Sequence, residues 1–211
     1  MTEVVDYAAV QVKEGSYPTG EHPLETEWVI WYDQRVRTSN RHESDVYASG
    51  LKPLGNFNTV EGFYRHYAHM LKPSDWPTDV NVHLFRKGSK PMWEEFPDGG
   101  CWILRIKKKV NANFVNRMWE SLLLGLIGEM FEMPDVVGAV LSTRHKEDVI
   151  SVWTASPNGR FQVGESLKVL LNLELNTVLQ YKPFANSMVD FSSFRNAKSY
   201  QVQVSKPEGE S

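Results

Sequence analysis

The 211-residue chain has little cysteine, little net charge and no long apolar run, and each shortage excludes a class of protein. With one cysteine, Cys101, it cannot form an intrachain disulfide framework, which favours a reducing compartment. A formal net charge of −3 gives no broad basic surface, so nucleic acid would have to bind at a small basic site. No apolar run approaches the roughly 18–20 residues that span a bilayer, and no secretory leader is visible. We therefore expect a cytoplasmic protein that does not bind membranes.

Motifs of catalysis are also missing. The chain has no Walker-type glycine loop, no nucleophile elbow and no His/Cys cluster at metal-binding spacing. Cys101 follows Gly99 and Gly100, a place that suits a nucleophile, but the alternating pattern after it favours a residue of a sheet. The sequence therefore predicts no catalytic residue, no metal and no cofactor.

The chain divides into two tails and one domain. Residues 1–21 and 205–211 lack a clear apolar pattern and are expected to be flexible, which leaves a single domain over residues 22–204. Within this domain, β-favouring or alternating segments predict strands near residues 28–32, 102–107, 136–143, 149–155, 177–181 and 200–204.

Three helices are predicted between these strands. The first begins near Asn58, with Glu61 three residues on as in a capping box, and runs to about Met70. The second has apolar residues at three- and four-residue steps over residues 115–130, and the third covers about residues 164–175. Because strands outnumber the helices spread among them, the pattern predicts an α+β fold in which helices cover one face of an antiparallel sheet.

One short signature, Trp93-Glu94, pairs an aromatic side chain with a carboxylate in a loop-like segment. Trp93 there either covers the edge of the core or stacks on a ligand, and both interpretations remain open. A tryptophan attracts a cationic ring by about 0.5–2 kcal/mol, depending on how far the pair is desolvated. A carboxylate accepts two parallel hydrogen bonds from the N1–H and N2–H edge of guanine. Taken alone, Glu94 is better explained as part of a solvated acidic turn.

A second signature, Arg144-His-Lys146, precedes Trp153. Arg144 and Lys146 alternate, so both side chains can point to one side and offer charge to phosphate oxygens. Taken alone, such a basic pair is usually part of a solvated surface. The strand pattern around Trp153 favours a place for it in the core. Together, an aromatic face, an edge-reading acid and phosphate-binding bases are what 7-methylguanosine triphosphate, the mRNA cap, requires.

The order of these motifs resembles the cap-binding translation initiation factor 4E family over roughly residues 22–204. The shared motifs are His22-Pro-Leu24, Phe57-Asn-Thr-Val-Glu61, Pro91-Met-Trp-Glu94, Gly99-Gly-Cys-Trp102, residues 119–129, Gly138-Ala-Val-Leu141, Arg144 and Val152-Trp-Thr154. The resemblance implies a strongly curved antiparallel sheet of about eight strands, backed by three helices on its convex face. The residues of these motifs are most similar to those of trypanosomatid members of the family, and the mRNAs of trypanosomatids carry a hypermethylated cap.

The resemblance also implies a role for each matching site residue. Tyr47 and Trp93 would stack on the cap, Glu94 would read the guanine edge, Trp153 would touch the N7-methyl group, and Arg144 and Lys146 would bind phosphate. Three positions depart from the family: Tyr47 replaces a tryptophan, and Val149 and Cys101 stand where basic residues are usual. The basic residues expected to compensate are Lys182, Arg195 and Lys198.

The family's convex surface takes a helix of a 4G-type scaffold protein, or of an inhibitor that shares its motif. The matching positions are His22, Pro23, Val60, Tyr64, Leu124 and Gly128. Leu124 lies off the main apolar stripe of its helix, and Gly128 one turn on permits close approach. Glu120 stands where a leucine is expected, which implies an altered choice of partner.

Two functions follow from these features. The first is to bind capped mRNA and recruit a scaffold for translation initiation. The alternative, prompted by Tyr47, Val149 and Cys101, is a weakly cap-binding or cap-deficient paralogue that acts as a translational repressor or interaction scaffold.

Overall fold

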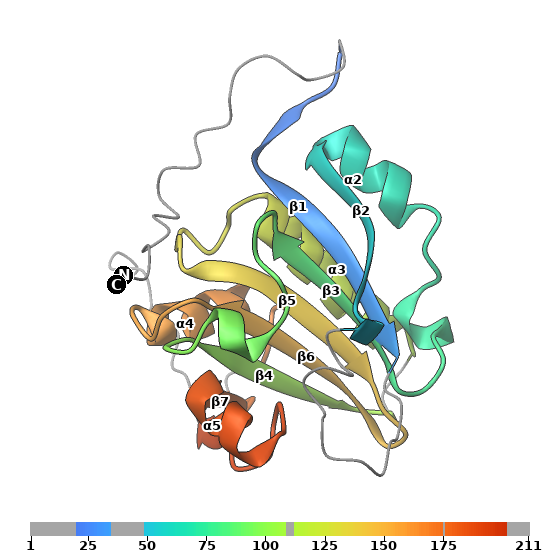
Figure 1. Cartoon of the computed structure of the whole chain (residues 1–211). Helices are drawn as coiled ribbons and strands as arrows, with labels where there is room; N and C mark the ends of the chain where they lie inside the picture. Colours follow the sequence, from blue (N-terminus) through green and yellow to red (C-terminus); the bar gives the residue numbers. More distant parts are fainter. Residues whose placement is uncertain (1–19, 35–48, 109–111, 175, 202–211) are drawn as a thin grey trace, which may run out of the picture.

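The computed structural model describes residues 20–34, 49–108, 112–174 and 176–201. Over these residues eight strands form one antiparallel sheet, in the spatial order β2-β1-β3-β5-β6-β4-β7-β8 (Figure 1). The strands are β1 (Pro23–Gln34), β2 (Lys52–Thr59), β3 (Val80–Arg86), β4 (Gly100–Lys107), β5 (Val136–Thr143), β6 (Glu147–Thr154), β7 (Leu179–Pro183) and β8 (Lys198–Tyr200). The α+β fold with about eight strands is therefore confirmed.

Three helices cover one face of the sheet, as expected, and a fourth lies on the other. The helices are α2 (Val60–Tyr67), α3 (Ala112–Ile127), α4 (Arg160–Leu170) and α5 (Phe184–Asp190), with 3₁₀ turns η2 (Pro73–Asp75) and η3 (Trp93–Glu95). In Figure 1, α3 and α4 lie behind the sheet, whereas α5 lies in front of it at the β7 edge. None of the helices in the described ranges is long and apolar enough to cross a membrane.

Alternation along the strands divides the apolar side chains between two cores. In β3, Val82 and Leu84 join a large cluster with α3 and α4 on the helix-covered face. Phe85 points to the opposite face, where a smaller cluster includes Trp153 of β6 and Phe184 of α5. We call this second side the open face, because among the described residues it lacks the long helices α3 and α4, and the cover it has comes from the short α5, the loop after it and the η3 turn.

Two strands and one helix were not predicted from local pattern. Strand β2 contains a proline and a glycine and lies at the edge of the sheet, so it lacks the apolar alternation of a central strand. Strand β3 buries Asn81 and His83 on the open face, so its sequence does not follow the pattern of a strand with one buried and one exposed face. Helix α5 has only seven residues, too few for a helical period to show.

The helix boundaries also differ from the expectations. Helix α2 is capped by Thr59, whose Oγ accepts a hydrogen bond from Gly62 N at 2.9 Å, while Asn58 belongs to β2. Helix α4 begins at Arg160, four residues before the predicted start at Gly164. An added Cβ at Gly164 would lie 2.8 Å from Cζ2 of Trp102, so the missing side chain lets α4 approach the sheet closely.

The predicted tails fall almost entirely outside the described residues, and their flexibility stays a prediction. Glu21, assigned to the first tail, accepts hydrogen bonds from Thr59 Oγ at 2.6 Å and from Arg65 Nη1 at 2.6 Å. The ordered contacts of the domain therefore begin at least one residue before the predicted boundary.

Candidate functional site

Two tryptophans belong to or border one apolar cluster on the open face. Trp153 of β6 is buried between Phe85 and Phe184, with ring-centroid distances of 5.3 and 4.3 Å, and its Nε1 donates to Ser151 Oγ at 3.2 Å. Trp93 packs against the same cluster but remains partly exposed. Trp93 therefore covers the edge of the core and also offers part of its surface to a ligand, so the two interpretations are compatible.

The η3 turn places an acid beside this tryptophan. Phe96 N donates to Trp93 O at 3.0 Å, which closes the turn, and the Phe96 ring is buried in the cluster on the open face. Glu94 and Glu95 are exposed on the turn. The local fold thus holds Trp93 against the core while the carboxylate of Glu94 stays accessible, which is the arrangement that edge recognition needs.

The basic signature lies at the other end of β5 and β6. Arg144 opens the turn between these strands, where its backbone N–H donates to Glu147 O at 3.0 Å. Its Nη1 donates to Thr143 O at 2.8 Å and its Nη2 to Asn81 Oδ1 at 2.8 Å, while Lys146 is exposed in the turn. Thr143 pairs with Asp148. Five strand steps from there to Trp153 span about 16 Å.

Trp153 and Arg144 therefore belong to one hairpin and lie at its two ends, and Trp93 of the η3 turn packs against the cluster that contains Trp153. Tyr47, the second expected stacking residue, lies outside the described residues, and its role stays a prediction.

Two positions where the resemblance implies basic residues are buried here. Val149 and Cys101 both belong to the apolar cluster of the open face. Burial raises the pKa of the Cys101 thiol to about 12, while the charge of Lys182 acts in the opposite direction. Neither side chain offers a positive charge to phosphate.

Arg105, which the sequence reasoning overlooked, supplies a cation beside these positions. It pairs directly with Val149 across β4 and β6, so both side chains point to the open face. Its guanidinium donates to both carboxylate oxygens of Glu147, an interaction that raises the pKa of Arg105, and it lies 5.4 Å from the ring centroid of Phe194. The alternation over residues 102–107 was the signal, because it places Arg105 on the same face as Cys101.

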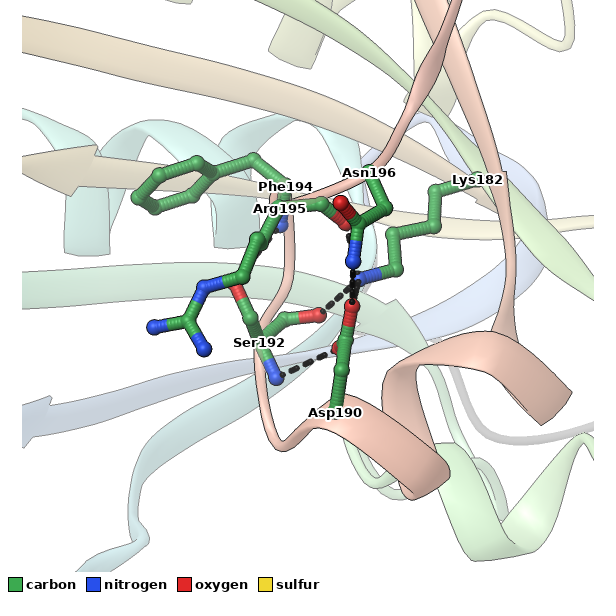
Figure 2. Close-up of polar contacts among 6 residues, drawn as sticks. All are labelled: Lys182, Asp190, Ser192, Phe194, Arg195 and Asn196. Atoms are coloured by element: carbon green, nitrogen blue, oxygen red, sulfur yellow. Dashed lines mark hydrogen bonds and ion pairs between the residues drawn. The ribbon is translucent and has the colours of Figure 1, made fainter.

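Lys182 does not offer its charge at the surface. Its side chain is 0% exposed, and its ammonium group donates to both Asp190 carboxylate oxygens at 2.7 Å, to Ser192 O at 2.8 Å and to Arg195 O at 2.5 Å. Figure 2 shows the ammonium enclosed by the loop after α5. This arrangement is at odds with the expectation that Lys182 binds phosphate, because its donors are already used inside the protein.

The other two expected basic residues are accessible. Arg195 and Lys198 are exposed, and in Figure 2 the Arg195 guanidinium points away from the enclosed ammonium of Lys182. The sequence could identify these charges but could not separate them from the buried one, since that depends on how the loop folds back over β7.

The expected partner surface lies on the opposite side of the sheet, over α2 and α3. Tyr64 and Leu124 are 46% and 39% exposed, and Gly128 is exposed at the end of α3. His22 donates its backbone N–H to Glu61 Oε2 at 2.8 Å and contacts Glu61 Oε1 through Nδ1 at 2.7 Å. The two remaining positions are Pro23, which is exposed at the start of β1, and Val60, which is half-buried at the start of α2.

Glu120, at the position where a leucine was expected, links the two helices of this surface. Burial raises the pKa of Tyr67 to about 12, and the charge of Glu120 and its hydrogen bond to Tyr67 contribute further. Glu120 is itself exposed, so an acidic group stands on the partner surface between α2 and α3.

Comparisons with known proteins agree with this architecture. The family model described as eukaryotic initiation factor 4E matches residues 23–199. The chain is 37% identical over 199 residues to the eukaryotic translation initiation factor NCBP of Arabidopsis thaliana, covering 92% of this chain and 87% of that protein. The chain therefore belongs to the eukaryotic initiation factor 4E family.

Solved structures of the family are similar in fold. The complex of C. elegans eIF4E-3 with the 4E-binding protein Mextli and cap analog has a TM-score of 0.71 and 28% identity, covering 80% of this chain and 96% of that chain. The complex of Ascaris suum eIF4E-3 with m2,2,7G cap has a TM-score of 0.70 and 31% identity, covering 77% and 91%. None of these relatives tests the narrower similarity to trypanosomatid members, which stays a prediction.

Proposed function

We propose that this protein binds the 7-methylguanosine cap of mRNA on the open face and a helix of a partner protein on the helix-covered face, in translation initiation. The observation that carries the proposal is the placement of Trp93 and Glu94 on the η3 turn, at one end of the hairpin that carries Arg144 at its other end. Membership of the initiation factor 4E family supports it. So do the similar folds of eIF4E-3 complexes with a cap analog and with Mextli.

The roles of the residues follow from their chemistry. The half-buried ring of Trp93 stacks on the methylated base, whose positive charge strengthens the contact. Glu94 accepts hydrogen bonds from the two N–H groups of the guanine edge, a pair of donors that adenine lacks. Arg144 and Lys146 bind the phosphates, Tyr47 provides the second stacking ring, and Trp153 borders the methyl group. These are binding roles, and no bond is made or broken.

The partner helix is proposed to lie across α2 and α3. Tyr64 and Leu124 provide apolar contact area, and Gly128 lets a helix approach without a side chain in the way. Glu120 makes the same surface less apolar than the expected leucine would. A partner with a polar or basic residue at the facing position is therefore favoured.

A second candidate is a repressor or interaction scaffold that binds the cap weakly. The burial of Val149 and Cys101, with the enclosure of Lys182, favours it because these positions add no accessible positive charge near the phosphates. This candidate predicts firm binding of the partner helix together with weak binding of the cap.

Quenching of tryptophan fluorescence by 7-methylguanosine triphosphate, with GTP as the control ligand, tests the proposal. We expect dissociation constants of micromolar or below for the methylated nucleotide. GTP should bind at least roughly tenfold more weakly, because it lacks the cationic ring. The variant Trp93→Leu should lose this binding, since the ring that stacks on the base is removed.

Trp76→Leu provides the matched control. Trp76 is also partly exposed, but it packs against the core of the helix-covered face. Retention of normal, methyl-dependent binding by Trp93→Leu would contradict the assigned site. Weak binding of the nucleotide by the unaltered protein, with firm binding of a partner helix, would favour the second candidate.

A further inference from the structure

A chain of polar groups runs from the interior of the open face to Arg144. Asp33, Asn81 and His83 are 3%, 7% and 2% exposed. Asn81 Nδ2 donates to Asp33 Oδ1 at 2.7 Å, and Asp33 Oδ2 lies 2.6 Å from His83 Nε2. The Oδ1 atom of Asn81 then accepts the hydrogen bond from Arg144 Nη2 at 2.8 Å. The phosphate-side arginine is thus linked to a buried carboxylate through one amide.

This chain has a fixed direction because a carboxylate can only accept. Asp33 turns the NH₂ group of Asn81 toward itself, so the carbonyl oxygen of the same amide must face Arg144. Reversal of the amide would place its oxygen against the Asp33 carboxylate and its NH₂ group against a guanidinium. Both ends would then be repulsive. Asp33 therefore decides which atom Asn81 offers to Arg144.

The strands hold this geometry rigidly. Asp33 and Asn81 are directly opposite each other in the pairing of β1 with β3, and His83 lies two residues along the same strand. Burial of a carboxylate is costly unless it is hydrogen-bonded, and Asn81 and His83 occupy one oxygen each. The side chains that hold Arg144 in place are thus fixed by the pairing of two strands and by their own hydrogen bonds.

At the far end, two contacts fix the plane of the guanidinium. Nη2 is held by Asn81 Oδ1, and Nη1 by the backbone oxygen of Thr143 at 2.8 Å. A guanidinium has five N–H groups, so it can keep two such contacts and still donate to a phosphate. An arginine held in place before the ligand arrives loses less side-chain freedom on binding.

We infer that Asp33 is a positioning residue for the phosphates of the ligand. Clamped by His83, it orients Asn81 and through it holds the Arg144 guanidinium toward the phosphate chain. This inference rests on the proposed cap-binding function. It assigns to Asp33 an effect on phosphate recognition without any contact between Asp33 and the ligand.

The variant Asp33→Val tests the inference, because valine suits a strand and cannot accept a hydrogen bond. Dissociation constants would be measured for 7-methylguanosine triphosphate and for the monophosphate. The triphosphate should bind roughly tenfold more weakly, comparable to the loss of one hydrogen bond to a charged group. The monophosphate should change by less than about twofold, because it carries few of the phosphate contacts.

Asp148→Val is the matched control. Asp148 is equally buried at 3% exposed and lies on the same hairpin as Arg144, but it pairs with Lys108 at 2.6 Å. Both variants remove one negative charge from this end of the sheet. Coulombic repulsion of phosphate would fall in both, so weaker binding of the triphosphate by Asp33→Val, with binding by Asp148→Val unchanged or stronger, cannot come from the lost charge.

The background Arg144→Met separates positioning from a general effect on the fold. In this background, Asp33→Val should cause no further loss of triphosphate binding, because the residue that it positions is gone. An equal loss for both nucleotides, or the same loss with and without Arg144, would overturn the inference.

A second measurement holds even if the proposed function fails. In nuclear magnetic resonance spectra, the Nη protons of Arg144, assigned from Arg144→Lys, should show slow rotation of the guanidinium in the unaltered protein and fast rotation in Asp33→Val. If the unaltered protein shows no methyl-dependent binding, the cap proposal is wrong. Fast rotation in the unaltered protein would instead contradict the positioning role.

Discussion

Arg105 and Val149 lie directly opposite each other on the neighbouring strands β4 and β6. The position where the resemblance implies a basic residue holds a buried valine, while its direct partner on β4 carries an arginine on the same face. The guanidinium is held by Glu147, so its charge is partly neutralised before a ligand arrives. The acid and the base should therefore have opposite effects on the binding of phosphate.

Arg105→Met is expected to weaken binding of 7-methylguanosine triphosphate by about two- to fivefold, the range for a partly exposed charge. Glu147→Gln should strengthen it by a similar factor, because the variant removes the competing carboxylate. Fluorescence titration at low and high salt measures both, and the two effects should shrink together as salt rises. If both variants changed the affinity for the triphosphate in the same direction, Arg105 would act through the fold and not through its charge.

At the residue scale, the sequence identified charged and aromatic side chains but not which of them are buried. Trp93, Glu94 and Arg144 lie where a ligand could meet them, although their roles are still proposals. Lys182 was misplaced because its burial depends on Asp190 and on two backbone oxygens of a later loop. Arg105 was visible in the alternation of its strand, but its neighbour across the sheet could be identified only from the register.

At the scale of elements, the junction of β1 with α2 includes an ion pair between His22 and Glu61. The hydrogen bond that the His22 ring makes to the Glu61 carboxylate raises the pKa of His22 above its ordinary 6.5, and the hydrogen bonds that Glu61 accepts from the ring and backbone of His22 lower the pKa of Glu61 from 4.5 to about 2. The backbone joins the same elements, since Val60 N donates to His22 O at 2.9 Å. This junction carries three of the proposed partner-binding residues, His22, Pro23 and Val60.

The pair should make this junction pH-sensitive. The raised pKa of His22 gives a stabilisation that is fully present below pH 6.5 and is lost as pH rises through the folded value. The lowered pKa of Glu61 gives one that is present above pH 4.5 and is lost toward pH 2. We expect hydrogen-exchange protection of the Val60 amide to be higher at pH 6 than at pH 8.5, after correction for the intrinsic rate.

His22→Gln is the control for this prediction, because glutamine keeps a polar side chain but does not titrate. Its protection at Val60 should be nearly independent of pH over the same range. If the unaltered protein and the variant respond alike, the ion pair does not control the junction.

The elements that were missed show no clear period in the sequence, each for its own physical reason. Periodicity identifies a strand when one face is apolar and the other polar, whereas β3 buries polar side chains on its open face. Strand β2 lies at the edge, and α5 is shorter than two full helical turns. The long helix α3 was predicted close to its observed bounds, because its apolar stripe is regular over four turns.

At the scale of the whole molecule, the sheet separates two proposed binding surfaces. Strand β3 illustrates the division, since Leu84 packs on the helix-covered side and Phe85 on the open side. Residue patterns predicted helices on one face, and the family resemblance added the number of strands. Neither predicted that α5 would lie on the open face beside η3.

This separation predicts that the two surfaces can be altered independently. Leu124→Glu should weaken binding of a partner helix by roughly tenfold or more, because a charge would be buried against apolar side chains. The same variant should leave the affinity for 7-methylguanosine triphosphate within about twofold. Calorimetric titration of each ligand, with Trp93→Leu as the reciprocal variant, measures both. Loss of both activities in either variant would contradict the independence of the two faces.

The enclosed ammonium group of Lys182 has a chemical consequence. An amine without exposed surface cannot react with acylating reagents until β7 and the loop after α5 separate, whereas Lys198 of the adjacent β8 reacts in the folded state. The yield of acylation at Lys182 relative to Lys198 therefore reports how often this margin of the domain opens. An enzyme that acetylates lysines would therefore reach Lys198 but not Lys182 in the folded protein.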